Sequence, residues 1–481
     1  MSFFAKVEET TDSSSPGLAP SEVEGAPRNG IAKVGDHRRS EAEVSRSHDV
    51  GTGIALLSGA AATIIRRLPG ILRRSLAVRS AHASSAAVLA CALALTGCQG
   101  GVSQKGEGSR NKIKIGTITS LTGSNAAFGQ AHKNGYAIAL DELNSRGGLL
   151  GKTVELDYYD DQSRPDQAVQ GVSKLVDLDN VPIILGAYSS ENTRAIVPAV
   201  TQKQVPLLMP TATADNVMET GSPWTFRICA GSGAYATATV AFLKGMGAPK
   251  TMAIIYENTN FGQSNAQAMQ AAAKQAGIEV VDTEAYQAST PDYKALLQRV
   301  KARSPAVIYF ASYLLDASTL MRQAEQVGLN PAYYTSAGTG FAAAEFPTPD
   351  KGAGRNAEYT FSVSQWLPSA KWKGSKEFDD KYVQRTGSHP AYHAIEAYIT
   401  LLAAAEAIKK ANSTDPKAIR DALKQLDMPE TTFGPIRFDP KGQNQHPVLI
   451  TQVQGGQYKV VWPADAAESK PIIPTPPWTK R

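Results

Sequence analysis

The chain has 481 residues, of which 42% are hydrophobic and 19% charged, and its net charge at neutral pH is +5. This length is sufficient for two or more core-forming units. The near balance of basic and acidic residues gives no argument for a nucleic-acid partner. Basic tracts that would indicate a membrane-binding patch are also missing. Specific partners must therefore be sought in the motifs.

Residues 66–97 have the layout of a secretory signal peptide. Arginines precede a stretch of small apolar residues that is too short to span a bilayer well. The sequence Leu95-Thr96-Gly97-Cys98 resembles the bacterial lipobox, in which Cys98 would carry the lipid and become the mature N-terminus. The alternative is a buried apolar helix with an incidental cysteine. We expect an exported protein, in the periplasm or on the outer face of the cytoplasmic membrane, anchored through Cys98.

The segments on either side of the signal peptide are polar. Residues 1–65 are either a disordered extension or the product of a start codon assigned too far upstream, which is the interpretation we favour. Residues 98–111 are predicted to be a lipidated tether rich in Gly and Ser. Beyond the tether only Cys229 remains, so no disulfide framework is expected and the core must stabilise the fold.

Strands and helices alternate after the tether. The expected strands are residues 113–118, 154–159, 182–185 and 205–209, followed after Gly231 by 251–256, 278–281, 306–310 and 332–335. The expected helices between them are residues 130–144, 191–203, 263–275, 293–302 and 317–327. This alternation predicts two parallel α/β units.

The C-terminal part has a different pattern. Helices are expected at residues 377–385, 391–411 and 417–426, and a hairpin at residues 447–453 and 458–462. The proline-rich tail, residues 464–481, is predicted to be unstructured.

The stretch from Ile183 to Ser190 contains an apolar run followed by an aromatic residue and two hydroxyls. A buried parallel strand has such a run, and ligands of open α/β sheets bind beyond the carboxyl ends of the strands. Free amides at a helix start also bind anions. Thr211 and Thr213 follow the next strand in the same way. We expect these turns to bind a small anionic ligand, although the serines are alternatively N-caps and the threonines turn residues.

Several motifs occur in a specific order and spacing between Lys112 and Trp462. They are Ile115–Gly123 with Phe128-Gly129, Asn144–Gly151, Tyr159-Asp160-Asp161, Asn260-Phe261-Gly262, the block from Phe378 to Tyr398, and Gly434–Asp439 with Gly442. In this order they resemble the leucine/isoleucine/valine-type, or type I, periplasmic solute-binding proteins of ABC importers.

The resemblance implies an α/β fold of two lobes joined by three crossovers, each lobe a parallel sheet flanked by helices. Lobe one would comprise residues 112–230 and 360–438, and lobe two residues 231–358 and 440–463. The lobes would close on an amino acid, an amide or an organic acid and present it to an ABC permease. Such a receptor is a monomer without catalytic activity, cofactor or metal.

The resemblance also assigns a ligand site. Tyr188, Ser189 and Ser190 match the first ligand turn, in which Ser190 corresponds to the serine that receives the carboxylate. Thr211 and Thr213 match the second turn, and Gly338 belongs to a ligand loop of lobe two. Phe128, Phe261 and Tyr313 match an aromatic wall, with ordinary core packing as the alternative.

One position departs from the family pattern. The amino-acid binders carry an acid immediately before the glycine of the loop that matches Ala337-Gly338-Thr339, and here that residue is Ala337. A buried ammonium group without a carboxylate partner is strongly unfavourable, so amides, urea and aromatic acids are also candidate ligands. Glu257 and Asp316 are the nearby acids, and each is expected to cap or open a helix.

Other functions have weaker support. Residues 338–343 fit the dinucleotide fingerprint G-x-G-x-x-A, with Glu358 as the ribose-binding acid, but an exported lipoprotein has little access to NAD. The two serines lack the G-x-S-x-G frame of a hydrolase. His389 and His393 are expected on the surface rather than at a metal. A ligand-sensing domain for a signalling partner and an exported hydrolase remain the alternatives.

Overall fold

The computed structural model describes residues 111–481, all within one compact unit of the chain. The predicted signal peptide, Cys98 and the tether up to residue 110 lie outside the described residues and remain predictions. Within residues 111–481, no helix has the length and apolar character needed to cross a bilayer.

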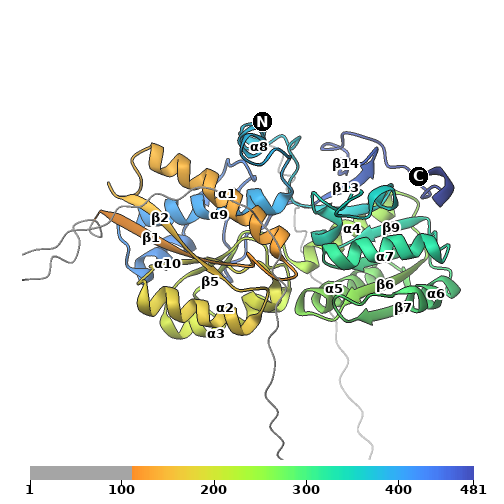
Figure 1. Cartoon of the computed structure of the whole chain (residues 1–481), viewed down its shortest axis with the longest axis horizontal. Helices are drawn as coiled ribbons and strands as arrows, with labels where there is room; N and C mark the ends of the chain where they lie inside the picture. Colours follow the sequence, from red (N-terminus) through yellow and green to blue (C-terminus); the bar gives the residue numbers. More distant parts are fainter. Residues whose placement is uncertain (1–110) are drawn as a thin grey trace, which may run out of the picture. The chain divides into compact units, whose positions relative to one another are not determined.

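The first parallel sheet has the strand order β2-β1-β3-β4-β5. Its strands are β1 (Lys112–Thr119), β2 (Thr153–Asp160), β3 (Ile184–Gly186), β4 (Leu207–Met209) and β5 (Thr225–Arg227). The helices α1 (Ala126–Ser145) and α9 (Tyr392–Ala411) lie on one face, and α2 (Pro165–Ser173) and α3 (Ser190–Lys203) on the other (Figure 1). Because strand side chains alternate between faces, Leu185 and Leu208 pack with α1 and α9, whereas Ile184 and Leu207 pack with α2 and α3.

Helices α1 and α9 approach each other closely at Gly135. A Cβ atom at this position would lie 2.0 Å from the carbonyl oxygen of Ala394. Any larger residue would therefore force the two helices apart. This contact holds the start of α9, which is distant in sequence, beside the first sheet.

Two further helices complete this half, α8 (Ser375–Thr386) and α10 (Pro416–Lys424), together with the short pair β11 (Asp427–Met428) and β12 (Ile436–Arg437). The start of α10 follows from its sequence: the Asp415 side chain accepts a hydrogen bond from the backbone N–H of Ala418 at 2.9 Å, and Pro416 occupies the first turn.

The second parallel sheet has the strand order β7-β6-β8-β9. Its strands are β6 (Thr251–Glu257), β7 (Glu279–Tyr286), β8 (Val307–Ala311) and β9 (Tyr333–Ser336), and its helices are α4 (Ser232–Gly245), α5 (Asn260–Gln275), α6 (Lys294–Ala302) and α7 (Leu314–Gln326). The same alternation directs Ile254 and Tyr309 toward α4 and α5, and Ile255 and Phe310 toward α6 and α7. The alternating α/β pattern predicted from the sequence is thus present in both halves, where the fold places all strand carboxyl ends at one edge of each sheet.

A third, antiparallel sheet consists of β10 (Phe361–Ser364), β13 (Leu449–Gln454) and β14 (Gln457–Trp462), with β13 in the centre. The hairpin turn at residues 455–456 agrees with the sequence prediction. The prediction assigned residues from 360 onward to lobe one, but β10 pairs with β13, and Phe361 and Val363 pack in the same core as α4. The chain therefore returns to the first half only after β10.

The prediction of an unstructured tail is wrong. The indole N–H of Trp478 donates to the carbonyl of Leu329 at 2.8 Å, and the backbone N–H of Thr475 donates to that of Ala332 at 2.9 Å. The guanidinium of Arg481 lies 3.5 Å from the Trp478 ring centroid. Proline removes backbone donors, but the remaining polar groups and one buried tryptophan are enough to bind the tail to the second half.

Candidate functional site

The two serines of the first predicted ligand turn both accept hydrogen bonds from the protein. The Ser189 hydroxyl caps α3 by accepting from the backbone N–H of Asn192 at 3.1 Å. The Ser190 hydroxyl accepts from the backbone N–H of Ala214, also at 3.1 Å, and so joins the turns that follow β3 and β4. The N-cap interpretation therefore holds for Ser189, while Ser190 connects the two turns.

The two threonines of the second turn differ in their bonding. The Thr211 hydroxyl donates to the carbonyl of Tyr188 at 2.9 Å. The Thr213 hydroxyl is only 3% exposed and has no hydrogen-bond partner within the described part of the chain. A buried hydroxyl without a partner is costly and is uncommon in folded proteins. Of the hydroxyls in the two turns, Thr213 thus has the clearest capacity for a further hydrogen bond.

The predicted aromatic residues form one continuous group. The rings of Phe128, in α1, and Tyr188, after β3, stack with centroids 4.7 Å apart. Tyr313, which precedes α7, lies 6.2 Å from each of these rings and 5.0 Å from Phe261 of α5. Because two of these rings come from each half, the wall spans the boundary between the halves.

The sequence prediction missed the role of His393 in this wall. Its ring lies 4.9 Å from that of Phe128 and is 2% exposed, whereas the prediction placed it on the surface. His389 is exposed and pairs with Asp379, as expected of a surface residue. The two histidines face different surroundings because α9 starts between them, at Tyr392, and packs against α1. The signal for burial that the sequence offered is the predominance of Ala, Ile and Leu in the rest of α9.

A second buried histidine, His132, lies 5.4 Å from the Tyr188 ring. Burial lowers its pKa to about 3 and lowers the pKa of His393 well below the ordinary value, with the proximity of His132 as a smaller cause. Both imidazoles are therefore neutral at physiological pH. In each ring one nitrogen has no partner among the described residues.

The two halves contact each other directly beside the aromatic wall. The backbone N–H of Asn260 donates to the Glu191 carboxylate at 2.8 Å. The side-chain amides of Asn260 and Asn216 exchange two hydrogen bonds, of 2.7 and 2.9 Å. Since these bonds join the start of α5 to the first half, the halves are closed on each other here. Neither asparagine was identified as functional from the sequence.

Glu257 and Asp316 have different environments. Asp316 lies in the first turn of α7, as predicted, and accepts hydrogen bonds from the Tyr293 hydroxyl at 2.7 Å and the Ser289 backbone N–H at 3.1 Å. The cap of α5 is Thr259, so the expectation that Glu257 caps or opens this helix is wrong. Glu257 ends β6, is 3% exposed, and its Oε2 atom has no partner among the described residues. Burial, followed by the proximity of Asp316, raises its pKa to about 8.

The loop of Gly338 closes the second half against α9. Gly338 has φ +72°, and a Cβ atom there would lie 2.9 Å from the carbonyl oxygen of Val363. The next backbone N–H, of Thr339, donates to the Tyr392 hydroxyl at 3.0 Å. Residues Thr339–Ala342 form a short 3₁₀ turn. A dinucleotide fingerprint must open a helix to bind phosphate, so the NAD alternative has no structural support at this motif.

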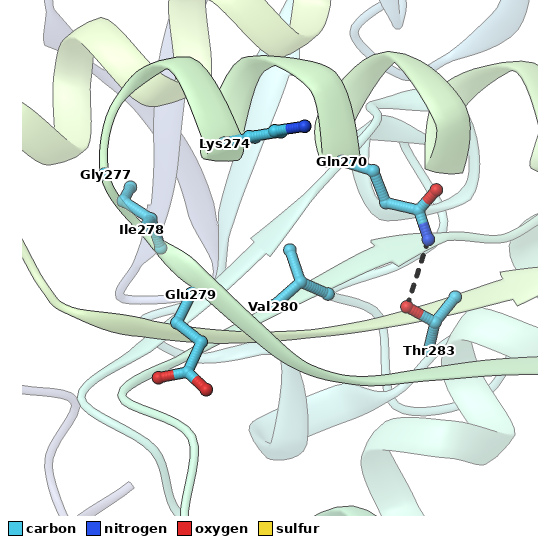
Figure 2. Close-up of a pocket in the computed structure, with 7 residues that line it drawn as sticks. All are labelled: Gln270, Lys274, Gly277, Ile278, Glu279, Val280 and Thr283. Atoms are coloured by element: carbon cyan, nitrogen blue, oxygen red, sulfur yellow. Dashed lines mark hydrogen bonds between the residues drawn. The ribbon is translucent and has the colours of Figure 1, made fainter. Parts of the chain in front are cut away.

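Two hollows of the surface lie apart from these side chains. One, of about 520 Å³, lies between the end of α5 and β7, where Gln270 bonds to Thr283 while Lys274 and Glu279 point away from each other (Figure 2). Another, of about 390 Å³, lies beside Tyr392. The first is open and contains none of the predicted site residues. The candidate site is therefore the group of converging side chains, which are packed together in the closed arrangement.

The described residues contain no group of three or more His, Cys, Asp or Glu side chains arranged to hold a metal ion. The polar groups at the boundary are hydroxyls, neutral imidazoles, the side-chain amides of Asn216 and Asn260, and the carboxyl groups of Glu191 and Glu257. Such a set can bind a small polar molecule by hydrogen bonds and by charge.

Two parallel α/β halves, with hydroxyl-bearing turns and a shared aromatic wall at their strand ends, define the class of two-lobed solute-binding proteins with the type I fold. The chain belongs to the periplasmic binding protein family, whose model matches residues 112–457. The resemblance and the fold predicted from the sequence are thereby confirmed. Family membership also places the chain among solute-binding proteins rather than enzymes and implies an exported, periplasmic protein.

Similar proteins carry related names. The Leu/Ile/Val-binding protein homolog 7 of Brucella suis is 27% identical over 379 residues, which cover 75% of this chain and 94% of that protein. The leucine-, isoleucine-, valine-, threonine- and alanine-binding protein of Pseudomonas aeruginosa is 27% identical over 330 residues, which cover 69% of this chain and 86% of that protein.

Solved structures agree with this fold. LivJ of Streptococcus pneumoniae, a branched-chain amino acid transporter substrate-binding protein in complex with isoleucine, superposes with a TM-score of 0.67 at 25% identity, covering 73% of this chain and all of that one. A solute-binding protein of an ABC transporter from Rhodopseudomonas palustris, in complex with 3,4-dihydroxybenzoic acid, gives a TM-score of 0.66 at 21% identity, with 72% and 95% covered.

Proposed function

We propose that the chain is the lipid-anchored receptor of an ABC importer and captures a small carboxylate or amide solute between its two halves. Cys98 would attach it to the membrane, and the closed, solute-loaded form would be presented to a permease. The observation that carries this proposal is the convergence of the Ser190 and Thr213 turns with an aromatic wall drawn from both halves. Two relatives are named as a Leu/Ile/Val-binding protein homolog and as a binding protein for leucine, isoleucine, valine, threonine and alanine. These names support a small solute with a carboxylate.

The proposed mechanism is capture followed by closure. The solute first meets the turns of the first half, where a carboxylate would receive charge-assisted hydrogen bonds, each of about 1.5–3 kcal/mol. Phe261 and Tyr313 then approach with the second half and remove the solute from water. Contacts made only in the closed form, such as those of Asn260 with Glu191 and Asn216, shift the population toward closure.

A calorimetric screen tests the proposal. The purified chain would be titrated with branched-chain amino acids, their amides, urea and aromatic carboxylates. We expect at least one class to bind with a Kd in the micromolar range or below, which corresponds to about −8 kcal/mol or better. A chain that binds no small solute but forms a stable complex with a signalling receptor would instead support the sensing function.

A further inference from the structure

Arg227, the last residue of β5, is a buried cation that the capture mechanism does not use. It is 3% exposed. Its Nη1 atom donates to the carbonyls of Ala212 and Ala214 at 3.0 and 2.9 Å. Its Nη2 atom donates to the Asp215 carboxylate at 3.3 Å. The guanidinium therefore holds the second ligand turn at the residues on both sides of Thr213.

The carbonyl of Thr213 itself is bound by the second half. It accepts hydrogen bonds from the backbone N–H and the hydroxyl of Ser232, the first residue of α4, at 2.8 and 3.1 Å. Three successive carbonyls of the turn are thus bound, two by Arg227 and one by Ser232. Because the rotamers open to a side chain depend on its backbone, these bonds also restrict the position of the Thr213 hydroxyl.

The third nitrogen of the Arg227 guanidinium bonds to the segment that joins β12 to β13. Nε donates to Gln443 Oε1 at 2.5 Å, and Gln443 Nε2 donates to the carbonyl of Cys229, between β5 and α4, at 2.8 Å. The backbone N–H of Arg227 donates to the carbonyl of Gly442 at 2.8 Å, and that of Asn444 donates to the carbonyl of Arg227 at 3.0 Å. Two of the connections between the halves therefore run side by side at Arg227.

The connection that leaves β10 is bonded to both of these. The side-chain oxygen of Gln365 accepts from the backbone N–H of Ala230, in the connection after β5, at 2.6 Å. The backbone carbonyl of Gln365 accepts from Nε2 of His446, in the connection before β13, at 2.8 Å. A hinge motion of the two halves must pass through these connections. Since they are bonded to one another, they form one hinge unit.

Arg227 itself is not available to a solute. All three of its nitrogen atoms donate to the protein, and Asp215 balances its charge. A buried guanidinium that loses such partners is strongly unfavourable, which keeps these bonds in place. An effect of Arg227 on the solute must therefore pass through the turn that it holds.

We infer that Arg227 is a positioning residue that couples the hinge unit to the second ligand turn. With the connections in the closed arrangement, its guanidinium holds Thr213 in the orientation that binds the solute. This inference rests on the proposed function and adds the path by which closure and binding reinforce each other. Because such coupling is reciprocal, a solute bonded to Thr213 favours the closed arrangement of the connections.

Gln443→Met tests the coupling, because it removes the acceptor of Arg227 Nε and leaves the turn itself unchanged. The matched control is Gln445→Met, the same substitution at an exposed position of the same connection. Hydrogen exchange of the solute-free full chain is followed by mass spectrometry on the peptide that contains residues 211–216. We expect exchange about fivefold faster in Gln443→Met and unchanged in Gln445→Met.

Gln443→Glu is the conservative variant, since it keeps the acceptor for Arg227 and loses only the amide donor. It should exchange at the wild-type rate. Exchange in Gln443→Met equal to that of the wild-type chain would overturn the inference, as would equally fast exchange in Gln443→Glu, which would assign the effect to the bond with Cys229.

Calorimetry with L-isoleucine and benzoate measures whether the coupling reaches the solute. For a probe that binds the wild-type chain, Gln443→Met should raise Kd about five- to tenfold. In a Thr213→Val background, where the hydroxyl is already absent, the same substitution should change Kd less than about twofold. An equal loss in both backgrounds would show that Gln443 affects only closure or folding, and would overturn the inference.

Arg227→Lys takes the place of Gln443→Met in both measurements if the latter does not fold, because lysine keeps the charge but has a single nitrogen for the turn and Gln443. A wild-type chain that binds a probe but shows no coupling refutes this inference alone. If no probe, including the solutes of the calorimetric screen, binds the wild-type chain, then the proposed function fails and this inference fails with it.

Discussion

The hydroxyl oxygen of Ser190 accepts a hydrogen bond from the backbone N–H of Ala214 at 3.1 Å. This bond ties the turn after β3 to the turn after β4, so that the two ligand turns proposed for the first half form one rigid unit. Ser190 consequently has a structural role even before a solute arrives. The effects of substitutions in the two turns on the free energy of unfolding and on solute affinity must therefore be measured separately.

Ser190→Ala should lower both the free energy of unfolding and the affinity for the solute. It leaves the buried N–H of Ala214 without an acceptor, which costs about 1–3 kcal/mol of the free energy of unfolding. Urea denaturation followed by circular dichroism measures this loss, and calorimetry measures the accompanying loss of solute affinity. Unchanged stability would show that Ala214 finds another acceptor.

Thr213→Val should lower the solute affinity without lowering the stability of the fold. The Thr213 hydroxyl is buried and has no partner within the described residues, so an isosteric valine should leave the free energy of unfolding unchanged or raise it by about 1–3 kcal/mol. Solute affinity should fall about tenfold, which is equivalent to about 1.4 kcal/mol. Thr211→Val is the matched control, because its hydroxyl bonds to Tyr188 and its loss should lower stability. Full affinity in Thr213→Val would remove this hydroxyl from the site.

Asn216→Ala should weaken solute binding by destabilising the closed form, although Asn216 is not one of the proposed solute contacts. It removes the two hydrogen bonds to the Asn260 side chain that join the halves, so the closed form becomes less populated. We expect a rise in Kd of about five- to twentyfold and a larger radius of gyration of the solute-free chain in X-ray scattering. Gln263→Ala, which loses only a bond to Asn258 within the same half, should change neither.

The buried histidines should make the fold sensitive to acid. His132 is neutral in the folded chain because burial lowers its pKa to about 3, whereas its pKa in the unfolded chain is about 6.5. Below pH 6.5 the unfolded chain binds the additional proton, so stability falls with decreasing pH down to about pH 3, by up to about 1.4 kcal/mol per pH unit. His132→Gln should reduce the slope of unfolding free energy against pH by this amount.

Urea denaturation at intervals between pH 7 and pH 4 measures that slope. His389→Gln, which replaces an exposed histidine, is the matched control. If the slope of His132→Gln equals that of the wild-type chain, then His132 is solvated or protonated in the folded state.

Cys98→Ser should release the protein from membranes. The thiol of Cys98 is the proposed site of lipid attachment, and serine cannot form the thioether. Fractionation of cells expressing the full chain should move the protein from the membrane pellet to the soluble fraction, while its solute affinity stays the same. Continued membrane association of the variant would argue against the lipid anchor.

The sequence by itself determined the alternation of strands and helices and the position of most elements, whereas α2, α4, β5, β10, β11 and β12 were given no range. This succeeded because the elements depend on local patterns: apolar runs such as Ile183–Leu185 form buried strands, and Asp415-Pro416 starts a helix through its own side chain and ring. The two hydroxyl turns and the aromatic residues of the candidate site were identified in the same way, from the ends of those strands and from family motifs.

Only the tertiary structure decided which side chains of the site retain free bonding capacity. The partners of Ser190 and Thr211 lie on other turns, and His393 is buried because Gly135 allows α9 to pack against α1. The packing of the tail by Trp478 and the lack of a partner for the Oε2 atom of Glu257 likewise depend on neighbours distant in the chain. Hydrogen-bond satisfaction and burial are properties of such long-range contacts, which local sequence patterns do not specify.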